Sequence, residues 1–459
     1  MPPATRASTR TSRSSPWLSS RRTVSRRNRT QPRKSILAWA LYDWGNSAFA
    51  TTVMAGFFPV MFKEYWSAGV DAAVSTARLG AANSLAGILV ALAAPFLGAV
   101  ADRTSAKKRF LFFFASLGIA STLCLTLAGK GDWALAGLLY ALALAGFLGG
   151  NVFYDSLLKT VSEGPAMDRV SSLGYALGYL GGGLLFAFNV WMTLDPRRFG
   201  LAGAAEAVRI SFLTVGLWWA VFAVPLMVMV REPRSTSMGI GNMVAEGISQ
   251  LGRTFREIRH LKVIMMFLAA YWLYIDGVDT VIVMAVDYGL SLGFHQKDLI
   301  LALLLVQFTG FPCAIAFGRI SGAIGTKKSI LIALGVYLFV TVWGAFIERR
   351  YEFYIMALLI GMVQGGVQAL SRSLYARLIP ADKAAEFFGF YNMVGKFAAI
   401  VGPVLVGTTV LLARAWGAGP GLAPRFSISS IAVLFLAGGV LLLLVDEERG
   451  VRERGFLER

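Results

Sequence analysis

The sequence contains few residues of the kinds that build disulfide scaffolds, metal centres or soluble enzymes. Its 459 residues include two cysteines and two histidines, and charged side chains make up 15% of the chain, against about 25% in a typical soluble domain. Cys124 and Cys313 lie in apolar runs, and His260 and His295 are too few for a histidine-rich metal site. These shortages exclude a disulfide-stapled secreted fold and most metalloenzymes, and we expect no cofactor.

Apolar side chains are abundant instead, at 56% of the chain with a mean hydropathy of +0.61. A helix that crosses a bilayer needs roughly 20 mostly apolar residues. Twelve such stretches fill residues 36 to 445, at 36–61, 79–101, 110–129, 133–154, 170–193, 210–230, 263–287, 299–318, 329–347, 353–370, 387–412 and 427–445. The strict alternation of barrel strands is missing, so we expect membrane-spanning helices.

The distribution of lysine and arginine predicts the orientation. With the N-terminus placed in the cytoplasm, 32 of the 44 basic residues fall on the cytoplasmic side, 11 fall on the other side, and Lys396 falls within a span. Basic residues concentrate in cytoplasmic loops, so both termini are expected inside. The net charge of +18 then reflects topology and attraction to anionic lipid headgroups rather than nucleic-acid binding. We expect a bacterial inner (plasma) membrane, with an organellar membrane as the alternative.

The polar segments divide the chain into domains. Residues 1–35 carry ten basic and no acidic side chains, which is typical of a disordered cytoplasmic tail, with a cleaved transit peptide as the alternative. Residues 231–262 place apolar side chains at helical spacing among arginines, which predicts an amphipathic helix on the cytoplasmic surface. Six spans at 36–230 and six at 263–445 flank this linker, and 446–459 form a second cytoplasmic tail.

The two halves repeat one another. A shift of 220 residues lays GAVADRTSAKKR at 98–109 on GRISGAIGTKKS at 318–329, so that Gly98 matches Gly318. A shift of 233 lays Trp39 and Asp43 on Trp272 and Asp276. Parallel repeats of six spans indicate a transporter built from two bundles.

Several motifs resemble a known family. The pattern GxxxDRxxxKKR at 98–109 is similar to the signature loop of the major facilitator superfamily. The segments LYDWGNSAFATT, DRVSSLGYALGYLGGG and GGVQALSRSLYARLIPADKAAEFFGFYNMVGK, at 41–52, 168–183 and 365–396, resemble its vacuole-effluxer-like branch. Eukaryotic members of that branch are autophagy-related exporters of amino acids from the vacuole. The resemblance implies an all-α membrane fold of twelve helices in two pseudo-symmetric six-helix bundles, and a transporter.

Polar residues inside the spans are the candidates for a binding site. An ionisable residue deep in a span costs about 2.5–3.5 kcal/mol to insert, so it usually faces a cavity or a partner. The candidate substrate- or proton-binding residues are Asp43, Asn46, Asp276, Asp279, Lys396, Tyr42, Gln364 and Asn392. If Lys396 faces Asp276 or Asp279, a zwitterionic solute such as an amino acid can replace both contacts. The structural alternative is that these side chains bond between helices or to backbone.

The basic loop after the second span predicts a cytoplasmic gate. Its members are Asp102, Arg103, Lys107, Lys108 and Arg109, which can hold neighbouring helix ends by charge-assisted bonds. The family resemblance implies that such a cluster stabilises the outward-facing state. The alternative is that the loop only enforces topology, but an acidic residue has no use in that role. In the second half, Gly322 stands where Asp102 stands in the first.

Together these features predict a secondary transporter, not an enzyme, that moves a small polar solute by alternating access with proton coupling. We expect a monomer with membrane lipids around it. One rival is a lipid or lysolipid translocase of the same fold, and another is a non-transporting membrane sensor or scaffold. No Walker A sequence and no intramembrane Ser/His pair occurs, so ATP drive and hydrolysis gain no support.

Overall fold

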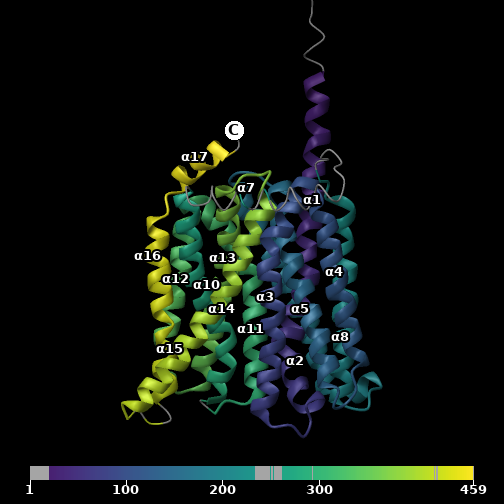
Figure 1. Ribbon diagram of the computed structural model, residues 1–459, viewed down its shortest axis with the longest axis vertical. Helices are drawn as coiled ribbons and strands as arrows, with labels where there is room; N and C mark the ends of the chain where they lie inside the picture. Colours follow the sequence, from purple (N-terminus) through teal and green to yellow (C-terminus); the bar gives the residue numbers. More distant parts are fainter. Residues whose placement is uncertain are drawn as a thin grey trace, which may run out of the picture.

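The computed structural model describes residues 20–232, 261–291, 293–417 and 422–457, with the isolated residues 249, 252 and 419. The described part is built from helices, and eleven of them are long and apolar enough to cross a membrane (Figure 1). A further helical segment, 36–66, completes the twelve predicted spans and is divided among α1, η2, α2 and η3. The all-helical membrane fold predicted from the sequence is confirmed.

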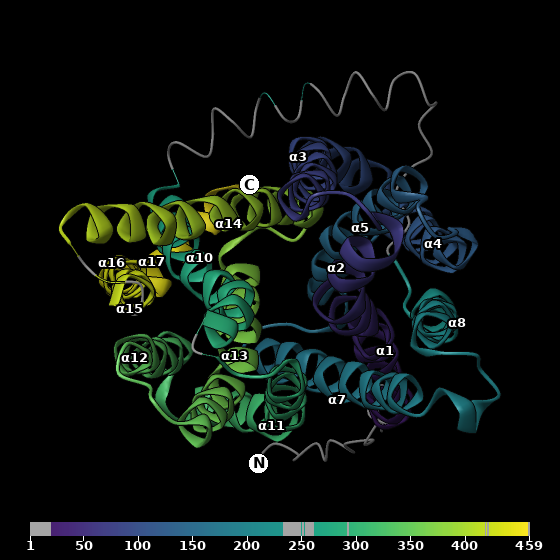
Figure 2. The same ribbon diagram turned by 90° about the horizontal axis from the view of Figure 1, so that it is seen from below.

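Two bundles stand side by side (Figure 2). The N-terminal bundle contains α1 (Ser20–Ala48), η2 (Phe49–Phe57), α2 (Phe58–Met61), η3 (Phe62–Trp66), α3 (Ala72–Thr104), α4 (Lys107–Cys124), η4 (Leu125–Leu127), α5 (Trp133–Ser156), α6 (Leu158–Val161), α7 (Ala166–Leu194), η5 (Pro196–Phe199) and α8 (Ala204–Met229). The C-terminal bundle contains α10 (Lys262–Ser291), α11 (Gln296–Ile324), α12 (Thr326–Gly344), α13 (Arg350–Leu378), α14 (Ala384–Ala415), α15 (Leu422–Ser430) and α16 (Ala432–Leu444), and α17 (Glu447–Leu457) follows it. We call the end of the bundles that carries α17 the upper end, as Figure 1 draws it.

The boundaries of α1 and α13 differ from those expected. The helix α1 begins at Ser20, so residues 20–35 are helical, while 1–19 lie outside the described residues. The helix α13 runs to Leu378, although the tenth span was expected to end at 370, because Arg372 and Arg377 find partners within the protein and do not need a loop in water. Moving these two arginines out of the loop leaves the excess of basic residues on one side nearly unchanged. The amphipathic helix expected at 231–262 lies almost wholly outside the described residues.

The bundles touch along two equivalent seams. The helix α3 packs along α14, and α11 packs along α7, so that the second helix of each repeat meets the fifth helix of the other. Gly98 of α3 and Gly318 of α11, which the repeat pairs, permit these contacts. A Cβ on Gly98 would lie 2.3 Å from the backbone oxygen of Ala385, and one on Gly318 would lie 2.6 Å from Cβ of Ser172. Both seams therefore depend on glycine at matching positions.

Candidate functional site

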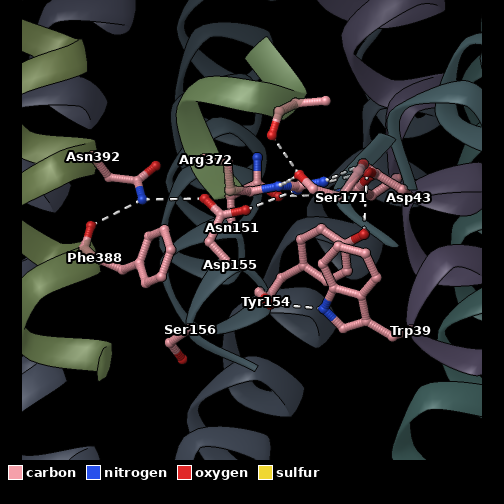
Figure 3. A network of polar contacts seen from close by, with 12 residues as sticks. Trp39, Asp43, Asn151, Tyr154, Asp155, Ser156, Ser171, Arg372, Phe388 and Asn392 are labelled. Carbon is pink, nitrogen blue, oxygen red and sulfur yellow. Dashed lines mark hydrogen bonds and ion pairs between the residues drawn. The ribbon is translucent and has the colours of Figure 1, made fainter. Parts of the chain in front are cut away.

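A buried arginine of the C-terminal bundle is held by the N-terminal bundle. Arg372 of α13 is 2% exposed. Its Nε donates to the hydroxyl of Ser171 (2.9 Å), its Nη2 donates to the carbonyl of Ser171 (3.0 Å), and its Nη1 donates to Oδ1 of Asp155 (3.0 Å; Figure 3). Three nitrogens of one guanidinium thus bond two residues across the seam, which is the fork geometry that arginine favours.

Aromatic rings enclose the same guanidinium. Its central carbon lies 4.9 Å from the ring centroid of Trp39, 5.4 Å from that of Tyr154 and 4.4 Å from that of Tyr175. These distances are within the range of cation–π attraction. Trp39 and Tyr154 stack at 4.5 Å, and the indole of Trp39 donates to the carbonyl of Tyr154 (3.0 Å). The rings therefore add to the ion pairs that hold this positive charge against the N-terminal bundle.

Two carboxylates share this one arginine. Oδ2 of Asp43 lies 3.8 Å from Arg372 and accepts the hydroxyl of Tyr154 (3.1 Å). Oδ2 of Asp155 accepts the amide of Asn392 on α14 at 3.4 Å. Asp43 thus keeps a partner inside its own bundle. Both recorded partners of Asp155, Arg372 and Asn392, belong to the other bundle (Figure 3).

The predicted neighbours of Asp43 serve the packing of the first bundle. Asn46 is buried and donates to the amide oxygen of Asn151 (2.8 Å). Tyr42 is fully buried and stacks on Tyr154 at 5.0 Å. Asn46 and Tyr42 therefore support the aspartate and its aromatic surroundings, and their burial keeps them from direct contact with a solute in this conformation.

A second ion pair joins the bundles nearer the upper end. Arg377 of α13 pairs with Asp168 of α7. The same carboxylate accepts the hydroxyls of Thr326 and Ser373, each at 2.6 Å. Arg377 also bonds Glu447 of α17 at 2.8 Å, and Arg454 of α17 donates to the carbonyl of Arg377 at 3.0 Å. The C-terminal helix therefore braces an arginine that holds the two bundles together.

Two charged side chains of the N-terminal bundle cap helix ends of the other bundle. Oδ2 of Asp102 accepts the backbone N–H of Glu386, in the first turn of α14 (2.8 Å), and Oδ1 pairs with Lys107 (2.8 Å). Lys159 of α6 donates to the carbonyls of Ala376 and Ile379, where α13 ends. An acid thus faces the positive end of one helix dipole and a base faces the negative end of another.

The five predicted gate residues do not act as one group. Asp102 and Lys107 meet at the seam, as described above. Lys108 turns away from it and donates to the carbonyl of Val230 at 2.6 Å. Arg103 and Arg109 are exposed. We therefore define the latch as the cross-bundle set Asp102, Asp155, Lys159, Asp168, Arg372 and Arg377. Of these six residues only Asp102 was predicted from the sequence. Arg372 and Arg377 lie beyond the expected end of the tenth span at 370.

A second group of charges has no bonded partner. Asp279 of α10 and Lys396 of α14 are half-buried, and the charge of each acts on the other. Within the described part of the chain, neither side chain has a recorded hydrogen bond, and the two do not form an ion pair within 4 Å. The half-buried Tyr175 of α7 lies within the influence of the charge of Asp279, and the half-buried Asn392 lies one helical turn before Lys396 on α14. Gln364 of α13 and Asn151 of α5 are half-buried as well. Charges at this depth without partners are suited to receive a polar solute.

Asp276 differs from Asp279, although the two lie on one helix face. Both oxygens of Asp276 accept the backbone N–H of Gly402 (3.0 and 2.9 Å), and Oδ1 also accepts the hydroxyl of Thr280 (3.3 Å). Pro403 follows and lacks an N–H, so α14 is weakened at this point and a side chain can replace part of its hydrogen-bond ladder. Asp276, 1% exposed, therefore stabilises α14 beside its internal proline.

We expect Asp276→Asn to lower stability, because the amide has one acceptor oxygen and leaves a buried N–H₂ group without a partner. The expected loss is about 1–3 kcal/mol in the free energy of unfolding, measured as thermal unfolding of the detergent-purified protein. Asp279→Asn is the matched control and should leave the unfolding temperature nearly unchanged. Equal losses in the two variants would contradict the stabilising role of the bond between Asp276 and the backbone N–H of Gly402.

Comparison with protein families and known proteins agrees with this architecture. The family model described as "Vacuole effluxer Atg22 like" matches residues 74–455. The chain is 36% identical over 413 residues to the MFS-type transporter YxiO of Bacillus subtilis (strain 168), covering 90% of this chain and 94% of that protein. It is 28% identical over 318 residues to autophagy-related protein 22-1 of Aspergillus niger, covering 64% of this chain and 50% of that protein. The chain thus spans about half the length of this fungal relative.

Solved structures share the fold at low sequence identity. The proton:xylose symporter XylE matches with a TM-score of 0.69 at 13% identity, covering 94% of this chain and 99% of that one. The human organic anion transporter MFSD10 matches with a TM-score of 0.67 at 14% identity, covering 90% and 99%. The transporter FucP in its outward conformation matches with a TM-score of 0.64 at 11% identity, covering 90% and 99%. At these identities the likeness concerns the fold alone.

Proposed function

We propose, from the fact that this chain belongs to the Atg22-like vacuole effluxer family of the major facilitator superfamily, that its two bundles carry a small polar solute by alternating access. The protein is a multi-pass membrane transporter and not an enzyme. The solute, the coupling ion and the orientation belong to the proposal.

The observation that carries the proposal is the position of the cross-bundle polar bonds. Those recorded among the described residues gather toward the upper end, where α3, α5, α6 and α7 of one bundle meet α12, α13 and α14 of the other. Alternating access requires two arrangements of the bundles that differ in which end is closed. Polar bonds concentrated at one end are expected of a state that is closed at that end.

The upper end is the cytoplasmic end in this proposal. The loops at this end carry the excess of lysine and arginine, which the positive-inside rule assigns to the cytoplasm. Both termini then lie in the cytoplasm, and the closed upper end makes this conformation outward-facing. Asp279, Lys396 and their half-buried neighbours are the groups that receive the solute.

The chemistry of this second group favours a zwitterion. A carboxylate and an ammonium that act on one another without touching can both be satisfied by one molecule that carries the opposite charges, such as an α-amino acid. Such a solute would bond Asp279 through its ammonium and Lys396 through its carboxylate. The family description, which names effluxers, and the autophagy-related relatives are consistent with this class.

Transport by reconstituted protein tests the proposal. We expect uptake of a mixture of radiolabelled α-amino acids into proteoliposomes, and we expect Asp279→Asn or Lys396→Gln to raise KM at least about tenfold, since each removes one charged hydrogen bond worth about 1.5–3 kcal/mol. Lys63→Gln, at an exposed lysine of the opposite end, is the control and should behave as the unsubstituted protein. Movement of a fluorescent lysolipid without amino-acid uptake would favour the lipid translocase instead, and no movement of either would favour a sensor.

A further inference from the structure

Asp155 differs from Asp43 and Asp102 in what it loses when the bundles part. Asp43 keeps the hydroxyl of Tyr154, and Asp102 keeps Lys107, because both partners lie in the same bundle. Asp155 loses the guanidinium of Arg372 and the amide of Asn392 together. A buried carboxylate that is left without its partner is strongly unfavourable. The opening of the upper end must therefore supply Asp155 with a new partner.

Asp168 also bonds only the other bundle, but its position is different. It lies in the first turn of α7, where the helix dipole favours a negative charge. Asp155 lies in the last turn of α5, where backbone carbonyls disfavour a negative charge. Of the two, Asp155 has the greater need of a proton once its arginine has left.

The charged and titratable groups around Asp155 are known in the described part of the chain. Arg372 comes from α13, Asp43 and Tyr42 from α1, Tyr154 from α5 itself and Tyr175 from α7, while α14 contributes the neutral amide of Asn392. One positive charge thus balances two carboxylates. When one proton binds a carboxylate of this group, one positive and one negative charge remain. Moving Arg372 away from the N-terminal bundle then leaves one negative charge there instead of two.

We propose that Asp155 is the proton-binding group of the transport cycle and that its protonation releases Arg372 and opens the upper end. The proposal rests on the alternating-access function proposed above. A proton from the open side enters past the half-buried side chains of Tyr175 and Asn392 and binds the carboxylate of Asp155. Arg372 keeps its own proton and leaves with α13. When Asp155 releases its proton to the upper side, Arg372 returns and the latch closes.

Spin labels across the upper end test this proposal. Glu163, before α7, and Asp382, before α14, are exposed on opposite bundles and are replaced by cysteine for labelling, with Cys124 and Cys313 replaced by serine. Distances between the labels are measured by pulsed electron paramagnetic resonance in lipid nanodiscs at about pH 8 and about pH 5, on either side of a buried carboxyl titration. We expect the long-distance population to rise at the lower pH.

Variants of Asp155 give the decisive comparison. Asp155→Asn, which resembles the protonated acid in shape, should show the long-distance population at both pH values, at least about tenfold above the unsubstituted protein at the higher pH. Asp155→Glu should keep a pH-dependent distance, which shows that the site tolerates substitution. Asp168→Asn is the matched control: it should favour the open end at both pH values and still respond to pH.

The outcomes separate this inference from the proposed function. If Asp155→Asn responds to pH as the unsubstituted protein does, Asp155 is not the proton-binding group, although the protein still alternates. The same holds if the distance changes with an added α-amino-acid mixture but not with pH. A distance that changes under none of these conditions would overturn alternating access itself and this inference with it.

Discussion

Arg372→Gln is expected to abolish net transport while the protein still folds. The substitution removes the only cation that the structure records near Asp43 and Asp155 among the described residues. Breaking a buried ion pair by removing one partner costs about 3–5 kcal/mol, which is a factor of more than about 100 in an equilibrium. Because the bonds of Arg372 cross the seam, this cost falls on the closed upper end, and we expect uptake into proteoliposomes to fall at least about 100-fold.

Arg372→Lys distinguishes charge from geometry. Lysine keeps the positive charge but presents it as a point, so it cannot bond Ser171 twice and Asp155 at once. We expect an intermediate loss, at least about tenfold. Arg209→Lys is the matched control, because Arg209 bonds the carbonyl of Thr126 within one bundle at the other end of the molecule. Full transport by Arg372→Gln, or an equal loss in Arg209→Lys, would show that the latch does not control the cycle.

Gly98→Val should prevent the upper end from closing. A Cβ at this position would lie 2.3 Å from the oxygen, 2.5 Å from the carbonyl carbon of Ala385 and 2.7 Å from the backbone nitrogen of Glu386, so α14 must move away. The nearest atoms all belong to the other bundle, so the fold of each bundle is unaffected. Overpacking of this kind costs about 1–3 kcal/mol. The Glu163–Asp382 label pair should then report mainly the long distance, and uptake should fall at least about tenfold.

Gly87→Val provides the matched control on the same helix. No atom lies within 4 Å of a Cβ built on Gly87. The two variants thus share the change in helix propensity and differ only in what the new side chain meets. If Gly87→Val opens the upper end as far as Gly98→Val does, the effect comes from α3 itself and the close seam with α14 is not its cause.

The architecture could be predicted from the sequence because it follows from local patterns. Apolar runs of membrane length define the spans, and the match between GAVADRTSAKKR at 98–109 and GRISGAIGTKKS at 318–329 reveals the two halves. The same repeat pairs Gly98 with Gly318, and the structure places both in equivalent seams. Asp102 could be singled out because an acidic residue in a basic loop has no use in membrane topology.

The latch could not be predicted because its bonds join pairs of residues that lie far apart in the sequence. Arg372 lies in a Ser-Arg-Ser segment at the end of an apolar run, which is the usual appearance of a loop. Its partners lie about 200 residues away in the sequence, at Ser171 and Asp155. The bonds of Lys159 to the end of α13 go to backbone carbonyls, which carry no residue signature. The signal available was the resemblance to the family, because Asp168, Arg372 and Arg377 lie in the segments 168–183 and 365–396 that carry it.

The in-span aspartates show the same limit at shorter range. Depth alone placed Asp276 and Asp279 together as candidates, since they are three residues apart and share a helix face. The difference between them arises from α14, where the N–H of Gly402 is offered to one carboxylate and not to the other. A single sequence shows that Pro403 weakens the hydrogen bonding of a helix. It does not show which side chain bonds the backbone beside the proline.

The docking of α17 has a practical consequence for anyone who handles the protein. Its Gly450 has no room for a side chain beside Leu378 and Val263, and its Glu447 reaches the arginine that pairs with Asp168. An affinity tag or a fluorescent protein fused behind Arg459 would therefore follow α17 directly and could disturb the contact between Glu447 and Arg377. Reporter fusions intended to leave turnover undisturbed therefore belong at the other terminus.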